Sequence, residues 1–262
     1  MAEKSRITKR HGEILNLLEK KNVVTISDLC SSTGCSATTI RNDLTYLERQ
    51  GLLRRTFGGA IQIDSSQTNY LDINIREKAH MFEKSSIAKY IVDNILQPDM
   101  TIILDAGTSC AELAHEIAQR RIPLAVITNS FRAAVALLPA LDIVELYMLG
   151  GNYDPVRGSL YDEFQTQVYQ KLRADMFFMG VDAIDSEQGI TIRGVVEVSL
   201  KQSMMNMASK TYALADNSKF GRNAMKCVCK ATDIEGIITD KKTDPQMVET
   251  LRGHGINVFV AD

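Results

Sequence analysis

The sequence predicts two domains, a small winged helix-turn-helix and a larger α/β domain with a mainly parallel sheet. The chain has 262 residues, which exceeds a typical single domain, and 45% of them are hydrophobic, enough for at least one core. Three helical patterns and a Gly-Gly turn fall within residues 1–62, the predicted first domain. Residues 63–75 read as a polar connector. In residues 76–262 apolar runs alternate with helical patterns, which is typical of parallel sheets covered on both faces.

The first two helices of the N-terminal domain have recognisable ends. Apolar residues recur at helical spacing over residues 5–20, which predicts an amphipathic helix. A second helix is expected over roughly 26–33. It starts at a capping-box pattern, with Thr25 followed three residues later by Asp28, and ends at Gly34, because glycine tolerates the positive φ common at helix ends.

The third helix is expected to carry the polar surface of this domain. It is capped by Ser36, turns Ile40, Leu44 and Leu47 inward, and stops at Gly51. The remaining face holds short polar groups and one arginine, which can bond base edges and phosphates. The helix residues predicted to contact DNA are Ser36, Thr38, Thr39, Arg41, Asn42 and Thr45.

A short basic hairpin, or wing, is predicted directly after the third helix. It contains Arg54 and Arg55, and Gly58-Gly59 forms its turn. Residues 1–62 hold 10 Lys or Arg against 6 Asp or Glu, whereas the rest of the chain holds 20 against 26. Only the first domain is therefore suited to a polyanion, and double-stranded DNA is the predicted partner. A helical bundle used for protein contacts is the alternative reading of the same pattern.

Several classes of protein are disfavoured by the sequence. No apolar run approaches a membrane span and no signal peptide is visible, so a cytoplasmic protein without a membrane partner is expected. Five cysteines favour reduced thiols, and Cys227 and Cys229 alternate like buried strand residues. The four histidines are dispersed, and no Gly-rich dinucleotide or ATP motif occurs. We therefore predict no metal, no cofactor and no catalytic residues.

The second domain is predicted to alternate helices and strands. A helix from residue 77 to Pro98 precedes the first strand. The expected strands cover residues 101–104, 124–127, 143–149, 176–179, 212–215, 234–239 and 256–260, and the other helices lie near 111–119, 133–138, 196–209 and 245–252.

Small polar residues follow three of these strands in succession. In parallel sheets ligands bind at the carboxyl ends of the strands, and a helix N-terminus beside hydroxyl groups binds phosphate well. The residues predicted to bind a ligand here are Asp105, Gly107, Thr108, Ser109, Thr128, Asn129, Ser130, Gly150 and Gly151. Ordinary βα turns and helix caps favour the same residue types and remain the alternative.

Two later segments are assigned to the same edge of the sheet. Asp216 and Lys219 follow a predicted strand, and Glu197 and Lys201 lie four residues apart on the long helix. An ordinary surface ion pair would explain the spacing of Glu197 and Lys201 equally well.

The helix and wing carry a family resemblance. The run Thr39-Ile40-Arg41-Asn42-Asp43-Leu44, followed by Leu47, Gly51, Leu53, Arg55 and Gly58-Gly59-Ala60, resembles the signature of the DeoR family of bacterial transcriptional regulators. One departure lies at Asn42, where the family usually has a second basic residue. Asparagine can read adenine or bond a phosphate, so the departure bears on the operator sequence rather than on DNA binding itself.

The second domain resembles the effector domain of the same family. The motifs are Asp105-Ala106-Gly107-Thr108, Thr128-Asn129-Ser130, Gly150-Gly151, Asp216-x-Ser218-Lys219-Phe220-Gly221 and Thr239-Asp240. The resemblance implies a fold related to ribose-5-phosphate isomerase, glucosamine-phosphate deaminase and the CoA transferases. It also implies a phosphorylated sugar as ligand, with Gly107, Thr108 and Ser109 at the phosphate and Lys201, Asp216 and Lys219 lining the pocket. Ser109 stands where the family often has a second threonine and keeps the hydroxyl.

These expectations lead to one leading function and two alternatives. The leading hypothesis is a DNA-binding regulator, a repressor of a sugar-metabolism operon, controlled by a phosphorylated sugar metabolite. A homo-oligomer is expected because one small domain contacts too little DNA for high specificity. The alternatives are a sugar-phosphate isomerase or deaminase with a DNA-binding appendage, using Asp182, Glu197 or Asp216 as a base, and a protein-protein adaptor.

Overall fold

The computed structural model describes the backbone of residues 2–21, 23–49, 53–56, 58–61, 73–154, 157–161 and 171–262; the side chains of 2–9, 19–20, 49, 74–75 and 195–196 are not described. The chain divides into two compact units, Met1–Ala79 and His80–Asp262. Most of the predicted connector lies outside the described residues, as does the predicted helix stop at Gly51. The last three residues of the connector, 73–75, begin the short helix α4 (Ile73–Lys78).

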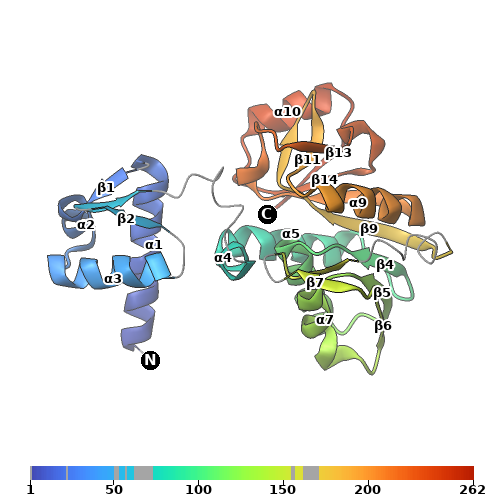
Figure 1. Cartoon of the computed structure of the whole chain (residues 1–262), viewed down its shortest axis with the longest axis horizontal. Helices are drawn as coiled ribbons and strands as arrows, with labels where there is room; N and C mark the ends of the chain where they lie inside the picture. Colours follow the sequence, from blue (N-terminus) through green and yellow to red (C-terminus); the bar gives the residue numbers. More distant parts are fainter. Residues whose placement is uncertain are drawn as a thin grey trace. The chain divides into compact units, whose positions relative to one another are not determined.

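The first unit is a winged helix-turn-helix, as predicted. Its remaining elements are α1 (Ala2–Lys21), β1 (Val23–Thr25), α2 (Ile26–Thr33), α3 (Ala37–Arg49), β2 (Arg54–Thr56) and β3 (Gly59–Ile61) (Figure 1). The capping box between Thr25 and Asp28 is present at the start of α2, and Gly34 ends that helix with φ of 67°. The strands form an antiparallel sheet in the order β1-β3-β2. A Cβ on Gly59 would lie 1.9 Å from the carbonyl oxygen of Val24, so no side chain fits at this crossing.

The second unit is built on seven parallel strands in the order β15-β14-β12-β9-β4-β5-β6. The strands are β4 (Thr101–Leu104), β5 (Leu124–Thr128), β6 (Val144–Met148), β9 (Ala174–Gly180), β12 (Ala208–Leu214), β14 (Gly236–Asp240) and β15 (Val258–Ala261). This confirms the predicted parallel sheet. Apolar runs such as Phe177-Phe178-Met179, all fully buried, exist because both faces of the sheet are covered.

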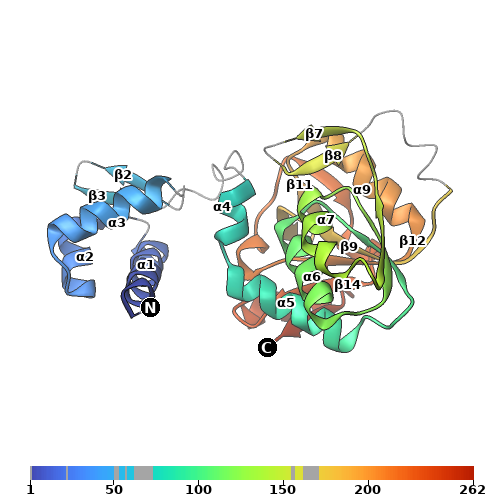
Figure 2. The ribbon, with the colours of Figure 1, turned by 90° about the horizontal axis from the view of Figure 1, so that it is seen from below.

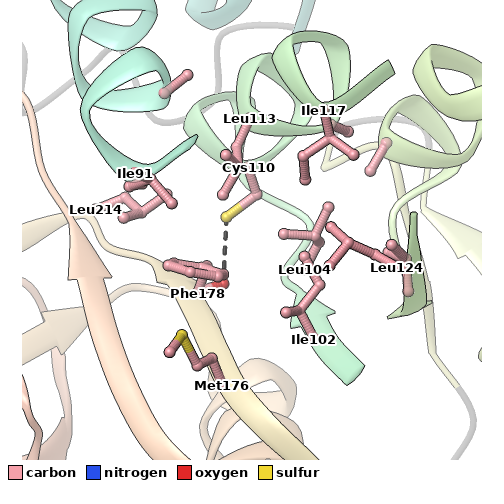
Figure 3. Close-up of a cluster of buried hydrophobic side chains, with 14 of the residues drawn as sticks. Ile91, Ile102, Leu104, Cys110, Leu113, Ile117, Leu124, Met176, Phe178 and Leu214 are labelled. Atoms are coloured by element: carbon pink, nitrogen blue, oxygen red, sulfur yellow. Dashed lines mark hydrogen bonds between the residues drawn. The ribbon is translucent and has the colours of Figure 1, made fainter. Parts of the chain in front are cut away.

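Helices cover the two faces of this sheet. One face packs against α5 (Met81–Asn94), α6 (Thr108–Arg120) and α7 (Phe131–Leu137), and the other against α9 (Val195–Met207) and α10 (Pro245–Gly253) (Figure 1). In the first of these cores the Cys110 thiol donates to the Phe178 carbonyl oxygen at 3.3 Å (Figure 3). Burial raises the pKa of this thiol, so it remains protonated. Met204 and Met207 fill the opposite core, as expected for methionines on a packed helix.

Four short strands were not predicted. They are β7 (Asn152–Asp154), β8 (Ser159–Tyr161), β10 (Ala183–Asp185) and β11 (Gly189–Ile192), and three 3₁₀ turns accompany them, η2 (Leu138–Ala140), η3 (Asn217–Lys219) and η4 (Ala231–Asp233). The strand β13 (Lys226–Cys229) lies where Cys227 and Cys229 alternate. The expected burial of Cys227 and Cys229 is wrong. Successive side chains of a strand point to opposite faces, and in β13 it is Val228 that faces the core. Cys227 is therefore exposed and Cys229 half-buried.

The helix predicted from residue 77 to Pro98 is also shorter than expected. It is interrupted before α5, where His80 adopts a left-handed conformation with φ of 53°, and it ends at Asn94. Over the residues described here, none of the helices combines the length and apolar character needed to cross a bilayer.

Candidate functional site

The outward face of α3 is exposed and polar, as predicted. Ile40, Leu44 and Leu47 are buried, and they turn Arg41 and Asn42 into solvent. Neither of these two polar side chains bonds another residue in the described part of the chain. Both are therefore available to base edges or phosphates. Thr38 is exposed on the same helix.

Two of the predicted contact residues form the helix cap. The hydroxyl of Ser36 accepts a hydrogen bond from the Thr39 amide at 3.3 Å, and the two hydroxyls lie 2.9 Å apart. Capping therefore occupies part of their hydrogen-bonding capacity, although Ser36 remains exposed.

The wing is held against α3 by Arg55. Its guanidinium donates to the Thr45 hydroxyl at 2.8 Å, and its backbone amide donates to the Glu48 carboxylate at 2.7 Å. The Thr45 hydroxyl in turn donates to the Arg41 carbonyl oxygen. Arg54 and Arg55 are both exposed, so the wing places two cations beside the polar face of α3. Such a surface is suited to a groove and its adjoining phosphates.

A buried acid that sequence reasoning missed anchors α3 to α1. Asp43 accepts hydrogen bonds from Arg10 at 2.6 and 2.9 Å, and the His11 ring nitrogen lies 3.0 Å from the same carboxylate. Burial raises the pKa of Asp43, but these bonds outweigh it and hold the pKa below its usual value. His11 also stacks on Tyr46 at 5.1 Å. The alternation of charged residues in α1 gave no sign of this pairing.

The second candidate site lies where the strand order of the seven-stranded sheet reverses. The chain runs from β4 outward to β5 and β6, then crosses to β9 on the other side of β4. Open parallel sheets bind ligands at this point, beyond the carboxyl ends of the strands. We call this edge of the sheet the rim. Here Gly107 and Gly180 pack backbone to backbone, and a Cβ on Gly107 would lie 3.2 Å from the Gly180 Cα.

A buried ion pair crosses the rim from α9 to β4. The Lys201 ammonium donates to the Asp105 carboxylate and, at 2.8 Å, to the Gly180 carbonyl oxygen. The Gly180 amide donates to the same carboxylate at 2.9 Å. Burial lowers the pKa of Lys201, but the attraction of Asp105 and Glu197 outweighs it and raises the pKa. The alternative of an ordinary surface pair between Glu197 and Lys201 is wrong, because Lys201 is 6% exposed and its partner is Asp105.

Glu197 lies beside this pair and is less completely satisfied. Its carboxylate accepts an ion pair from the Arg157 Nε at 3.0 Å, and Arg157 also pairs with Asp154 at 2.6 Å. Burial raises the pKa of Glu197 despite the nearby cations Lys201 and Arg157. A carboxyl group with a raised pKa in such a setting is a functional-site candidate. Arg157, in the unpredicted hairpin of β7 and β8, was missed from the sequence.

Two helix N-termini at the rim differ in how they are capped. At α7 the Ser130 hydroxyl accepts a hydrogen bond from the Ala133 amide at 3.1 Å. The Thr128 hydroxyl accepts from the Ser130 amide and donates to the Leu104 carbonyl oxygen. These two predicted ligand residues thus shape the turn. At α6 the capping residue Gly107 offers no side chain. The first amides of α6 therefore have no side-chain cap, and the hydroxyls of Thr108 and Ser109 begin the same helix.

The neighbouring strands add polar groups to the rim. Asn129 follows β5 and is 2% exposed; its amide nitrogen donates to the Leu160 carbonyl oxygen at 3.2 Å. Its side-chain oxygen is buried and accepts no hydrogen bond from any residue described here. Gly150 and Gly151 follow β6, and Gly151 has φ of 130°, which favours glycine.

Asp216 and Lys219 lie on the other side of the switch point, after β12. Asp216 is 1% exposed and accepts from the Ser218 amide at 3.0 Å. Burial raises its pKa, but Lys219, His80 and Lys84 are among the groups that together hold the pKa low. Within the described part of the chain the Lys219 ammonium forms no ion pair. The sequence gave no reason to place His80 and Lys84, from the start of α5, beside this rim.

The start of α5 is fixed to the rim by a second ion pair. Glu83, 6% exposed, accepts from the Lys242 ammonium at 2.5 Å, and Lys242 follows β14. Asp240, at the end of β14, accepts from the Asn217 amide at 2.8 Å. Among the described residues, His, Cys, Asp and Glu side chains nowhere gather in a group of three that could hold a metal ion.

Comparisons with known proteins agree with this two-part arrangement. Residues 10–66 match the DeoR-like helix-turn-helix domain, and residues 79–241 match the DeoR C-terminal sensor domain. The chain belongs to the DeoR family. The predicted resemblance is thereby confirmed.

Relatives of this DeoR-family chain align over almost its whole length. A protein of Escherichia coli O157:H7 named as a transcriptional repressor of the aga operon is 34% identical, covering 97% of this chain and 93% of that protein. The glycerol-3-phosphate regulon repressor of Escherichia coli K12 is 27% identical, covering 96% and 98%. Among solved structures, ribose 5-phosphate isomerase from Methanocaldococcus jannaschii aligns with 52% of this chain and 53% of its own, at 19% identity and a TM-score of 0.38.

Proposed function

We propose that this chain is a cytoplasmic, sequence-specific DNA-binding repressor of a sugar-metabolism operon, controlled by a phosphorylated sugar metabolite. Family membership and the names of its relatives as repressors support this proposal. The observation that carries it is the pairing of two surfaces in one chain. One is the exposed polar face of α3 with its wing, and the other is the α6 N-terminus at the switch point of the sheet.

At the DNA end, α3 would enter the major groove. Arg41 and Asn42 would reach base edges from its exposed face, with Thr38 beside them, while Arg54 and Arg55 of the wing would hold phosphates. Two or more copies would read repeated half-sites, because one domain contacts too little DNA for high specificity.

At the effector end, the phosphate would lie against the first amides of α6 and the hydroxyls of Thr108 and Ser109. Lys219, which has no ion-pair partner in the described chain, would supply a cation. The open side-chain oxygen of Asn129 would accept a hydrogen bond from one sugar hydroxyl, and the carboxyl group of Glu197 would bond another. The groups that follow β4 and β5 are within reach of one small molecule, because neighbouring strands lie about 4.8 Å apart; Lys219 follows β12, two positions from β4 in the sheet order.

The switch would work through a difference in affinity. The effector changes operator binding only to the extent that it favours one arrangement of the two domains over another. The first turn of α5 is well placed to transmit this effect. It follows α4, which begins at the end of the connector, and Glu83 ties it to the rim through Lys242.

A gel-shift titration against the promoter of the neighbouring genes tests the DNA end. Operator affinity should fall steeply as salt rises, because binding releases counterions from the phosphates. Binding that is insensitive to both DNA sequence and salt would instead favour the protein-protein adaptor. Arg55→Ala should weaken binding to all sequences alike and reduce the salt slope by about one.

The environment of Glu197 would also be compatible with an enzyme, the alternative function. The raised pKa of Glu197 would also suit a general base acting beside a carbonyl group. We propose binding rather than turnover, since the neighbouring Asp105 and Lys201 are committed to each other. Steady-state assays with aldose phosphates and amino-sugar phosphates decide this. Turnover that is abolished by Glu197→Gln would overturn the proposal that the chain is only a regulator.

A further inference from the structure

The outer face of α7 is apolar where a surface helix is ordinarily polar. Phe131 and Val135 of α7 are 50% and 48% exposed, and Leu138, which directly follows the helix as the first residue of η2, is 57% exposed. The opposite face, including Ala133 and Leu137, is buried in the core of the domain. A helix that already packs its inner side on the sheet has no need of an apolar outer side.

The apolar surface continues beyond the helix. Tyr153 of β7, 49% exposed, packs its ring edgewise on Phe131 with the ring centres 5.8 Å apart. Leu141, 45% exposed, follows η2 at the other end of α7. We call these five residues the α7 patch: Phe131, Val135, Leu138, Leu141 and Tyr153. Figure 2 looks onto α5, α6 and α7 and onto the hairpin of β7 and β8 beyond them.

The size of the α7 patch suits a protein partner. Aromatic side chains present roughly 150–250 Å² each and aliphatic ones less, so five side chains at about half exposure offer at most about 500 Å². This lies within the range of the largest patch on a typical monomer, about 300–600 Å². It is also a large part of the about 800 Å² that each partner buries in a stable interface.

The sheet ends beside the α7 patch. β6 is the last strand in the sheet order, and among the described strands only β5 pairs with it. Its outer row of amides and carbonyls is an edge that another strand can extend. Met148 of β6 is 42% exposed on this edge strand. Apolar side chains and backbone hydrogen-bonding groups thus lie together at one border of the domain.

The apolar character of the α7 patch favours a second copy of this chain as the partner. The five residues carry no charge, so the patch is complementary to itself, and a twofold axis brings the same patch from each copy together. Two equivalent β6 edges can meet across such an axis. We propose that the α7 patch and the β6 edge form the interface through which two copies pair. Pairing would also supply the two DNA-binding domains that the proposed function requires. The exposed apolar area and the open strand edge support pairing independently of that function.

The test is the molar mass of the full chain, without DNA or effector, by light scattering after size exclusion at micromolar concentration. Phe131→Glu with Leu138→Glu places charges at the centre of the patch and should reduce the mass of the assembly by half or more. Val135→Lys is a milder second variant and should shift the same equilibrium. Circular dichroism of each variant reports folding; these side chains are exposed, so the spectra should match wild type.

The matched control is Phe82→Glu. Phe82 lies on α5 outside the α7 patch and is 89% exposed, more than any patch residue. Its substitution should leave the mass unchanged. A wild-type chain that is monomeric throughout, a folded patch variant with the wild-type mass, or an assembly lost with Phe82→Glu alone would overturn the proposal. Because no operator is present, these results do not depend on whether the chain is a repressor.

Discussion

The buried acid Asp43 of the first domain and the half-buried acid Glu197 of the rim are satisfied differently. In the first domain, Asp43 receives two hydrogen bonds from Arg10 and lies beside His11, and its pKa is held low. At the rim, Glu197 has one ion pair, with Arg157, and its pKa is raised by burial. The folded environment therefore favours the charged form of Asp43 and disfavours the charged form of Glu197.

The difference separates a framework whose buried charge is paired from the proposed effector site. The inside of the winged helix domain has its charges paired, and its functional groups, such as Arg41, lie outside in solvent. At the rim, Asn129 is buried and keeps an open acceptor, and the half-buried Lys219 lacks an ion-pair partner among the described residues. Unpaired or perturbed polar groups inside a protein point to function more strongly than exposed ones do.

The largest effect is expected from Lys201→Met. This change leaves the Asp105 carboxylate buried without its cation, and breaking such a pair costs about 3–5 kcal/mol of unfolding free energy. Urea unfolding at pH 7 measures the loss. The double variant Asp105→Asn with Lys201→Met removes both charges and should recover much of it. A single variant as stable as wild type would show that the rim does not depend on this pair.

Asp43→Asn should destabilise the first domain by about 2–3 kcal/mol, because charge-assisted hydrogen bonds are lost. The contribution of Asp43 to the free energy of unfolding of the wild-type chain also depends on pH. The folded pKa lies below the unfolded value of about 3.9, so the stabilisation is present above that value and disappears as pH falls through the folded pKa. Unfolding curves between pH 3 and 7 test this. Asp28→Asn, in the exposed capping box, is the control and should cost less.

Arg41→Ala should weaken operator binding by about 1–3 kcal/mol without changing stability, because the side chain is exposed and bonds no described residue. Gel shifts beside circular dichroism separate the two effects. Arg121→Ala in the second domain removes an equal charge from an exposed position and serves as the control. Equal loss from both variants would mean that α3 does not read the operator.

The smallest effect on stability is expected from Glu197→Gln, less than about 1 kcal/mol at pH 7, since Arg157 keeps its pair with Asp154. The sign of the pH dependence should be opposite to that of Asp43. The folded pKa of Glu197 is raised, so its contribution is present below the unfolded value of about 4.3 and is lost as pH rises through the folded pKa. Glutamine removes this dependence. Unfolding at pH 5 and pH 8 measures the difference.

Local signals explain why much of the fold could be predicted. The capping box at Thr25 and the glycine at Gly34 fix the ends of α2 within the residues that form them. Helical spacing places Ile40 and Leu44 in the core, and apolar runs mark central strands of the large sheet such as β4 and β9. Parallel strands put Asp105 and Asn129 on one edge without further information, because their carboxyl ends coincide.

The remaining features depend on contacts between distant residues. Lys201 and Asp105 are 96 positions apart, and no spacing rule joins them. The three-residue strand β10 is too short to show a period, and it exists because β11 pairs with it. In β13 the sequence alternates as expected, but only tertiary packing decides that Val228 rather than Cys227 faces the core.

The most direct test of the account is whether a phosphorylated sugar at the rim changes DNA binding. Operator affinity should be measured for wild type and for Lys219→Met across a panel of sugar phosphates, with the matching unphosphorylated sugars as controls. The account predicts that one phosphorylated compound changes wild-type affinity by about 5- to 100-fold, whereas Lys219→Met binds the operator normally but does not respond. An unchanged response in Lys219→Met, or an equal response to the unphosphorylated sugar, would contradict it.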